Sequence, residues 1–568
     1  MAEENSINKT PRQDKGRFSR RNFLKTASLA AVATSVGSGL AKSIVAQTPS
    51  GQTGTVGGLA GSSDSKLFYV VETTSGKVQG IASAGIKQFK GIPYGASTAG
   101  KNRFMPPKKP TPWTGVRECF GHGQVCPQTP ADLRSDYGMM IMWDQQNGGL
   151  GEDCLVLNVW TPGVNDAKKR PVFVSFHGGG YATGSGNAPG FDGAQLARYG
   201  DAVVVTVNHR LSSFGYTHLA DLGAPPEFKF AGVTGIMDLV ASLEWVRDNV
   251  EKFGGDPGRV MIFGQSGGGA KTSTVLATPS AKGLFHRAAV QSGSSLRLTT
   301  RETATKAAEL LLANLEIPKS RIADIQKVSW QQLLEAQTAV TGAGFSPVMD
   351  GTILPHHQSD PVAPPESADV PVIISTTLED AALRLTNFNL DEAGLKTILN
   401  QRFPGKGDAI LSLYRQHYPQ KTPFLIQAQV FTDSAARRAA ITQAERKAVL
   451  GKAPAYMYLW EWETPSFSGR YGAVHGIDVS ASFHNYRDQM LGTGAPGGTV
   501  MADRLTSAWV AFASTGDPNN PHLPRWRPYD ATTRATMIFD TDTRAENDPR
   551  SDIRKFWAEA QTQTGTGD

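Results

Sequence analysis

The chain has 568 residues, of which 39% are hydrophobic and 19% charged, so its composition is that of a globular protein with enough apolar residues for a large core. The net charge of +6 would suggest a polyanionic partner, but residues 1–46 carry +5 of it, and the remainder is nearly neutral and has no basic block. We therefore expect no nucleic-acid partner.

The basic start of the chain is typical of an export signal. S-R-R-N-F-L-K at 19–25 precedes a mildly apolar run at 27–41, and its paired arginines resemble the twin-arginine export motif. The apolar run is too short, and too diluted by Ser, Thr and Gly, for a stable membrane span. We expect the twin-arginine machinery to export the protein to the periplasm or out of the cell. The predicted parts are a signal peptide over 1–46, a flexible leader over 47–65, one catalytic domain over 66–560 and a polar tail over 561–568.

Beyond the leader, β-like and helix-like segments alternate, which predicts helices packed on a mostly parallel sheet. The strand-like runs are short, β-branched and apolar, as expected for strands covered on both faces. The helical segments carry apolar residues at helical spacing. The predicted strands are 172–176, 202–207 and 260–263, the predicted helices are 236–253, 303–315 and 433–447, and a turn at 254–257 and a Pro-rich loop at 355–371 connect them.

Three successive glycines follow the first of these strands, in H-G-G-G-Y at 177–181. Glycines let backbone N–H groups point into a cavity, and acyl transfer needs such donors for the oxyanion of its transition state. The segment therefore indicates an oxyanion loop, with a generic glycine-rich turn as the alternative.

A serine follows the strand at 260–263, in G-Q-S-G-G at 264–268. This fits G-x-S-x-G, in which a sharp turn between strand and helix lifts the serine hydroxyl above the sheet and flanking glycines avoid collisions. In a chain with 60 glycines the motif alone is weak evidence. Its position downstream of the H-G-G-G segment is the order expected of an α/β-hydrolase.

These motifs and three further blocks resemble the type-B carboxylesterase/lipase family, the cholinesterase-like branch of the α/β-hydrolase fold, and in particular its bacterial para-nitrobenzyl-esterase-like members. The blocks are F-K-G-I-P-Y at 89–94, G-E-D-C-L-V-L-N-V-W at 151–160 and residues 249–263. The resemblance implies a large, mostly parallel central sheet with helices on both faces and a helical cap that forms a gorge. It also implies a serine esterase without cofactor or metal.

The resemblance further implies a triad in the chain order serine, acid, histidine. Ser266 would be the nucleophile, and His475, in V-H-G-I-D at 474–478, would be the general base. The acid would be Asp380, with Glu379 as its rival one step earlier. Residues whose surroundings match the family less well are Asp350 and Asp478 for the acid and His356, His357 and His484 for the base.

The same resemblance assigns the oxyanion-binding N–H groups to Gly179, Gly180 and Gly267. Ser292 resembles a serine that helps to hold the acid and base, with an ordinary turn serine as the alternative. The family usually has alanine at position 267 and glutamate where this chain has Gln265. Loss of that carboxylate removes an attraction for cationic substrates, so a neutral ester is expected rather than a choline ester.

Three cysteines suit an exported protein with one disulfide and one free thiol. Cys126 and Cys154 match the family's first disulfide, which leaves Cys119 unpaired. Such a bridge would stabilise the fold by roughly 3–4 kcal/mol. Because twin-arginine substrates fold in the reducing cytosol, we expect the bridge to form only after export, with incomplete formation as the alternative.

The expected function is a serine carboxylesterase that hydrolyses neutral small-molecule esters through an acyl-enzyme. The three-glycine loop resembles that of hydrolases which also accept bulky or tertiary alcohol groups. A carbamate or amide hydrolase of the same fold is the first alternative, and a non-catalytic adhesion or binding homologue is the second. The sequence does not indicate an oligomeric state.

Overall fold

The strands pair into one large sheet in the computed structural model, which describes residues 66–130, 136–140 and 147–562. The predicted signal peptide (1–46) and leader (47–65) lie outside these residues. The strands are β1 Phe68–Thr73, β2 Gly76–Ser83, β3 Ile86–Pro93, β4 Val116–Glu118, β5 Val156–Thr161, β6 Arg170–Phe176, β7 Val203–Val207, β8 Gly255–Gln265, β9 Arg287–Gln291, β10 Val372–Thr377, β11 Ala455–Trp460, β12 Ala535–Phe539 and β13 Arg544–Asn547.

The centre of the sheet is parallel and its two ends are antiparallel. The described strands follow the order β1-β2-β3-β5-β7-β6-β8-β9-β10-β11-β12-β13, with β4 beside β2. Each neighbouring pair from β7 to β12 is parallel. The pairs at either end of that block are antiparallel. The mostly parallel sheet that the sequence predicted is therefore a mixed sheet with a parallel core.

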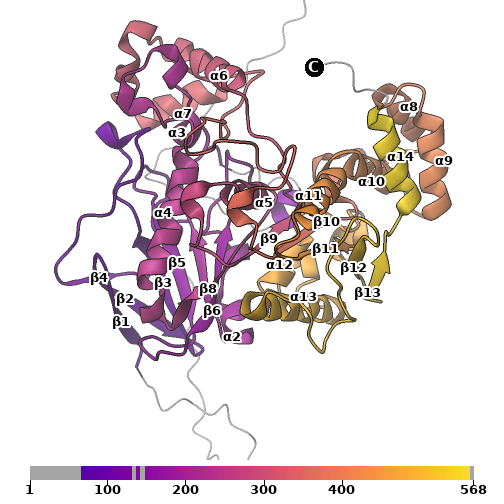
Figure 1. Cartoon of the computed structure of the whole chain (residues 1–568), viewed down its shortest axis with the longest axis horizontal. Helices are drawn as coiled ribbons and strands as arrows, with labels where there is room; N and C mark the ends of the chain where they lie inside the picture. The colour runs from indigo at the N-terminus through magenta and orange to yellow at the C-terminus, as the bar shows by residue number, and fades with distance from the viewer. Residues whose placement is uncertain (1–65, 131–135, 141–146, 563–568) are drawn as a thin grey trace, which may run out of the picture. The chain divides into compact units, whose positions relative to one another are not determined.

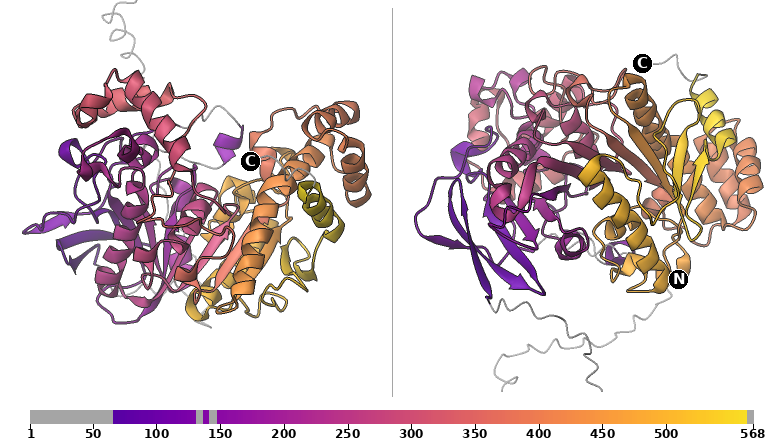
Figure 2. Two further views of the ribbon diagram at one scale, coloured as in Figure 1. Left: turned by 45° about the horizontal axis from the view of Figure 1, so that its top comes forward. Right: turned by 60° about the horizontal axis from the view of Figure 1, so that its bottom comes forward.

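Helices cover both faces of the sheet, as Figure 1 and Figure 2 show. The helices are α1 Asp136–Met140, α2 Ala194–Tyr199, α3 Ser212–Tyr216, α4 Thr234–Asn249, α5 Gly267–Leu276, α6 Arg301–Asn314, α7 Trp330–Thr338, α8 Glu392–Arg402, α9 Gly407–His417, α10 Pro423–Thr432, α11 Arg438–Leu450, α12 Ile477–Ser482, α13 Pro496–Thr515 and α14 Ser551–Thr562.

The two faces have separate hydrophobic cores. Val174 and Ile262 belong to the core that α4, α5 and α11 share with one face. Phe173 and Phe263, their neighbours along β6 and β8, belong to the core beneath α2, α12 and α13. Successive side chains of a strand point to opposite faces, so strands covered on both sides are apolar at nearly every position. This explains the continuous apolar runs in the sequence.

A third, smaller hydrophobic cluster joins α8, α9, α10 and α14. Figure 1 shows α8, α9 and α14 side by side beyond the end of the sheet. These helices lie outside the sheet, and the helical cap and gorge that the family resemblance implies stay a prediction. None of the described helices is long and apolar enough to cross a membrane.

The predicted elements lie close to those of the structure and differ from them mainly at their ends. β8 begins at Gly255, inside the predicted turn, because its pairing with β6 jumps from Arg170–Gly255 to Val172–Val260 and the intervening β8 residues bulge out of the ladder. The predicted helix at 433–447 starts with a π-helical turn, Asp433–Arg437, before α11 begins. At the C-terminus, α14 includes the first two residues of the predicted tail.

Candidate active site

The predicted functional residues lie on loops that follow neighbouring parallel strands. In open α/β sheets ligands bind at the carboxyl ends of the strands, where such loops meet. The loops are 177–180 after β6, Ser266 after β8, Ser292 after β9, Glu379 and Asp380 after β10, and His475 beyond β11.

Ser266 has a strained backbone at the turn between β8 and α5. Its φ of 60° and ψ of −124° are unfavourable for a residue with a side chain. The turn is held because the Ser266 N–H donates to the Gln291 carbonyl on β9, at 2.8 Å. It also passes so close to β6 that a Cβ on Gly264 or Gly268 would overlap the carbonyl oxygen of Phe176. The glycines around the serine are therefore required by the packing.

His475 and Asp380 form a buried hydrogen-bonded pair. Nδ1 of His475 bonds to Oδ1 of Asp380, and the two residues are only 7% and 4% exposed. Burial alone would raise the pKa of Asp380, but its attraction to and hydrogen bond with His475 hold that pKa below its usual range. The Thr377 N–H also donates to Asp380, at 3.2 Å. Asp380 is thus kept ionised beside the imidazole.

The residues next to Ser266 and His475 lie close together, although, within the described part of the chain, the two side chains themselves are not hydrogen-bonded. Within the described residues, no hydrogen bond links the Ser266 hydroxyl to His475. Gln265 lies against the histidine loop, however, because a Cβ on Gly476 would be 3.8 Å from both polar atoms of its amide. Both of these amide atoms are buried without a hydrogen-bond partner among the described residues. In the free enzyme such catalytic hydrogen bonds are often long and tighten on substrate binding.

Glu379 bonds to the chain that leads to His475 and, among the described residues, not to the histidine ring itself. Its side chain is fully buried and accepts hydrogen bonds from Lys421 and Gln429 (2.7 Å each) and from the Ala473 N–H (2.8 Å). Its own N–H donates to the Ala473 carbonyl, which starts a short parallel bridge beside Val474. Asp380, the next residue, is thereby brought to His475. Of the two acidic residues, the geometry favours Asp380 as the partner of the base.

The three glycines of the expected oxyanion hole keep their N–H groups free. The N–H groups of Gly179, Gly180 and Gly267 have no hydrogen-bond acceptor among the described residues. Gly179 and Gly180 have positive φ values of 83° and 63°, which glycine adopts readily. Gly267 lies directly against Gly180. Free donors next to the nucleophile are the arrangement that an oxyanion requires.

Ser292 lies at the end of β9, close to the acid. Its N–H donates to the Ser375 carbonyl at 2.9 Å, and its φ is 45°. Its hydroxyl lowers the pKa of Asp380, although it has no hydrogen bond of standard geometry to a described residue. This position suits a residue that supports the acid.

We expect Gly267→Ala to lower kcat roughly tenfold to a hundredfold, less than the loss of a whole oxyanion donor. A Cβ at this position would overlap the backbone of Gly180, so the oxyanion loop must move. Steady-state kinetics with a p-nitrophenyl ester measure the effect. Gly121→Ala is the control, since a Cβ there meets no atom within 4 Å. A fully active Gly267→Ala enzyme would show that the loop tolerates the family's usual alanine.

Sequence reasoning missed two groups around His475. The Tyr137 hydroxyl, from α1, donates to the carbonyl of His475 at 2.9 Å, and no motif marks this contact. Asp478, considered only as a weaker triad acid, is fully buried and accepts a hydrogen bond from the Tyr458 hydroxyl at 2.7 Å. Burial, and then the nearby Asp380, raise the pKa of Asp478 to about 6 despite the hydrogen bond from Tyr458.

This raised pKa predicts a stability change with pH. Between the unfolded pKa of about 3.8 and about 6, the folded protein binds the Asp478 proton more tightly, so stability falls as pH rises through this window. Asp478→Asn keeps an acceptor for Tyr458 and removes the titration. We expect the free energy of unfolding of the variant, measured relative to wild type, to increase by roughly 2–3 kcal/mol from pH 4 to pH 7. Urea unfolding from pH 4 to 8 tests this, and an unchanged pH slope would contradict it.

The three cysteines are free, buried thiols in the structure, so the predicted Cys126–Cys154 disulfide is not formed in it. The two residues are nevertheless neighbours, because a hydrogen bond to Cys126, followed by burial, raises the pKa of Cys154. Cys126 also accepts a hydrogen bond at Sγ from the Leu211 N–H, at 3.2 Å.

No group of three or more His, Cys, Asp or Glu residues in the described ranges is arranged to hold a metal ion.

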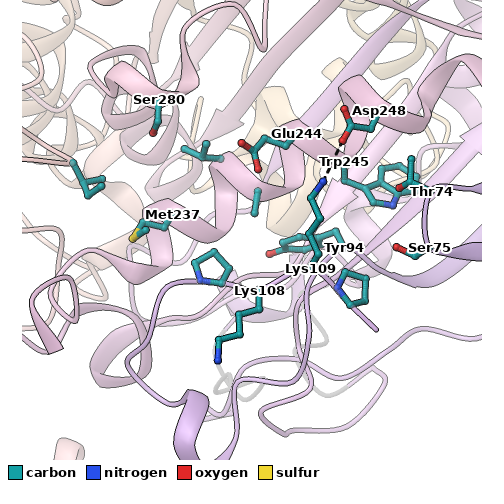
Figure 3. Close-up of a pocket in the computed structure, with 15 residues that line it drawn as sticks. Thr74, Ser75, Tyr94, Lys108, Lys109, Met237, Glu244, Trp245, Asp248 and Ser280 are labelled. Carbon is teal, nitrogen blue, oxygen red and sulfur yellow. Dashed lines mark ion pairs between the residues drawn. The ribbon is translucent and has the colours of Figure 1, made fainter. Parts of the chain in front are cut away.

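A cavity of about 270 Å³ lies against α4 (Figure 3). Met237 and Trp245 form part of its lining, and Nζ of Lys109 is 3.8 Å from a carboxylate oxygen of Asp248. Its lining includes none of Ser266, Asp380 and His475. It is therefore distinct from the catalytic site.

The sheet order, the nucleophile turn and the loops at the strand ends define an enzyme of the α/β-hydrolase fold. The model of the carboxylesterase family matches residues 68–557. The chain therefore belongs to the carboxylesterase family, the type-B carboxylesterases.

Similar proteins agree with this assignment. The chain is 32% identical to the para-nitrobenzyl esterase of Bacillus subtilis (strain 168) over 86% of its own length and 98% of that protein. It is 31% identical to the phenmedipham hydrolase of Pseudarthrobacter oxydans, covering 83% and 94%. The crystal structure of carboxylesterase EST55 from Geobacillus stearothermophilus matches with a TM-score of 0.74 and 33% identity, over 86% and 99% of the two chains. The protein is a serine carboxylesterase that hydrolyses carboxylic esters.

Proposed function

We propose that Ser266, His475 and Asp380 are the catalytic triad of this esterase. The observation that carries the assignment is the buried hydrogen bond between His475 and Asp380, at the strand ends beside the strained turn of Ser266. An Asp hydrogen-bonded to Nδ1 leaves Nε2 free to accept the serine proton. Glu379 is less suited to this role, because both of its carboxylate oxygens accept hydrogen bonds from other groups.

The reaction then proceeds in two steps. His475 takes the proton of Ser266 as Oγ attacks the ester carbonyl, and the resulting oxyanion binds the N–H groups of Gly179, Gly180 and Gly267. His475 returns the proton to the departing alkoxide, which leaves an acyl-enzyme. In the second step His475 takes a proton from water as the water attacks the acyl-enzyme carbonyl. It then returns that proton to Oγ of Ser266 as the carboxylic acid leaves.

The proposed substrates are neutral esters of small molecules, including esters of bulky and tertiary alcohols. Gln265 next to the nucleophile carries no charge, so nothing at that position attracts a cationic alcohol group. The consecutive glycines at 178–180 leave the loop that would bind the ester carbonyl without side chains. Less crowding there is what a tertiary alcohol requires.

Paired esters test the substrate class. Turnover of p-nitrophenyl acetate, of a primary alkyl acetate and of the matching tert-butyl acetate is compared on wild type and Ser266→Ala. The proposal expects hydrolysis of both alkyl esters by wild type and of neither by the variant. Turnover of the primary ester alone would overturn the tertiary-alcohol proposal. A fluorophosphonate probe should label wild type, and a non-catalytic binding protein would stay unlabelled.

We also propose that the protein is exported through the twin-arginine route and that Cys126 and Cys154 form a disulfide after export. The neighbouring thiols support the pairing. Mass spectrometry of alkylated protein should detect three reactive thiols in denatured cytosolic protein and one in exported protein. Replacement of Arg20 and Arg21 by lysine should keep the protein in the cytosol. Three alkylated thiols after export would exclude the bridge.

A further inference from the structure

A buried lysine lies beneath the oxyanion loop and has no role in the mechanism above. Lys271 is on α5, five residues after the nucleophile, and is completely buried. It forms no ion pair with any residue in the described part of the chain, and burial holds its pKa well below the usual range. Burial of an amine without an ion-pair partner costs free energy, so we expect a role that explains it.

The polar partners of Lys271 are carbonyl oxygens of the oxyanion loop. Its Nζ donates to the His177 carbonyl at 2.8 Å and lies 3.5 Å from the Gly178 carbonyl. The latter oxygen is also 2.9 Å from Nδ1 of His177. A neutral amine keeps N–H groups, so a lowered pKa does not remove these hydrogen bonds.

These carbonyls control the direction of the oxyanion donors. In a trans peptide the C=O and N–H bonds point in opposite directions. When the Gly178 oxygen faces Lys271, the N–H of Gly179 in the same peptide unit must face away from it. The next unit is fixed similarly, because the Gly179 oxygen accepts hydrogen bonds from the N–H groups of Ala182 (3.2 Å) and Thr183 (3.0 Å).

We propose that Lys271 is a positioning residue of the oxyanion hole, which holds the His177 and Gly178 carbonyls so that the N–H of Gly179 faces the reacting ester. This inference rests on the proposed function, since it assumes that Gly179 binds the oxyanion. The loop contains three consecutive glycines, which have no side chains to fix its peptides. The Lys271 amine, which anchors the loop from α5, supplies the missing rigidity.

The test compares two buried lysines. Lys271→Met removes both contacts while preserving length and apolar volume. Lys447→Met is the matched control, because Lys447 is also buried and donates to two backbone carbonyls, those of Ser367 (2.8 Å) and Ala368 (2.9 Å), outside the active site. For each variant, kcat and KM are measured with a p-nitrophenyl ester. The inhibition constant of a trifluoromethyl ketone, which Ser266 converts to an anionic adduct, is measured as well.

We expect Lys271→Met to lower kcat roughly tenfold to a hundredfold with little change in KM, and to weaken the ketone by the same factor. The control should retain the wild-type kcat. An unchanged kcat in Lys271→Met, an unchanged ketone affinity, or an equal loss of kcat in the control would each overturn the proposal.

If the methionine variant does not fold, Lys271→Gln carries the same comparison. Its amide stays polar at the buried site but ends one bond short of the Nζ position, so we expect it to lose the contact with the His177 carbonyl and to show equal losses in kcat and in ketone affinity. Ser266→Ala separates the two levels of inference. Activity that survives in Ser266→Ala would overturn the proposed mechanism and, with it, the oxyanion hole. An inactive Ser266→Ala together with an unaffected Lys271→Met would overturn the role of Lys271 alone.

Discussion

Replacement of Ser266 by alanine is expected to lower kcat by roughly 10⁵–10⁶, because loss of the nucleophile disables the entire triad. The residual rate would come from substrate binding and the free N–H groups of the oxyanion loop. Stopped assays with p-nitrophenyl acetate, at enzyme concentrations high enough to detect that residual rate, measure the loss. A fall of less than a hundredfold would mean that another residue attacks the ester.

The same position also predicts a conflict between stability and activity. Ser266 has a backbone conformation that disfavours any side chain, so Ser266→Ala should leave the strain in place and the thermal stability nearly unchanged. Ser266→Gly should relieve it and be more stable than Ser266→Ala by about 1 kcal/mol, after allowance for the flexibility of glycine in the unfolded chain. Thermal unfolding of the two inactive variants tests this, and a less stable glycine variant would contradict it.

Asp380→Asn is expected to lower kcat by roughly 10³–10⁴ with little effect on stability, because the amide keeps the shape but stabilises the wrong imidazole tautomer. Glu379→Gln should instead lower the stability and have a smaller effect on kcat. It removes a buried carboxylate that accepts hydrogen bonds from Lys421, Gln429 and the Ala473 N–H, so we expect a loss of stability of roughly 2–4 kcal/mol. Its kcat should fall by less than that of Asp380→Asn.

Parallel measurement of kcat and of urea unfolding separates the two acids. Glu392→Gln is a suitable control, since Glu392 pairs with Arg415 at a partly exposed site outside the catalytic loops. It should change neither quantity by much. If Glu379→Gln lost more turnover than Asp380→Asn at equal folded fraction, Glu379 would be the triad acid.

The sequence predicts the sheet and the nucleophile turn well because their causes are local. Apolar runs identify β6, β7 and the end of β8, and the glycines at 264 and 268 are required by contacts with the strand beside them. Sequence order and the family resemblance also indicate Ser266 and His475 as partners. The structure adds that His475 is bonded to Asp380.

The remaining site residues depend on contacts that sequence does not reveal. Glu379 and Asp380 are adjacent acids, and their separate tasks follow from Lys421 and Gln429, more than 40 residues away. In the sequence, Lys271 is surrounded by small residues and cannot be told from a solvent-exposed lysine on a helix. Only the fold shows that its amine lies beneath a loop 94 residues earlier. The start of β8 was missed because the bulge in its pairing is a property of two strands together.

The arrangement of the site on adjacent strand ends sets its dimensions. The oxyanion loop follows β6 and the serine follows its neighbour β8. The supporting serine, the acid and the segment that leads to the base follow β9, β10 and β11 in turn. Neighbouring strands are about 4.8 Å apart, so the oxyanion loop after β6 and the serine after β8 leave the sheet one strand spacing apart. The spacing between these two parts is therefore set by backbone hydrogen bonding, whereas His475 comes from the loop after β11, three strands from β8. Loops elsewhere around the site can change in length and sequence to suit new substrates while this spacing between the oxyanion loop and the serine stays fixed.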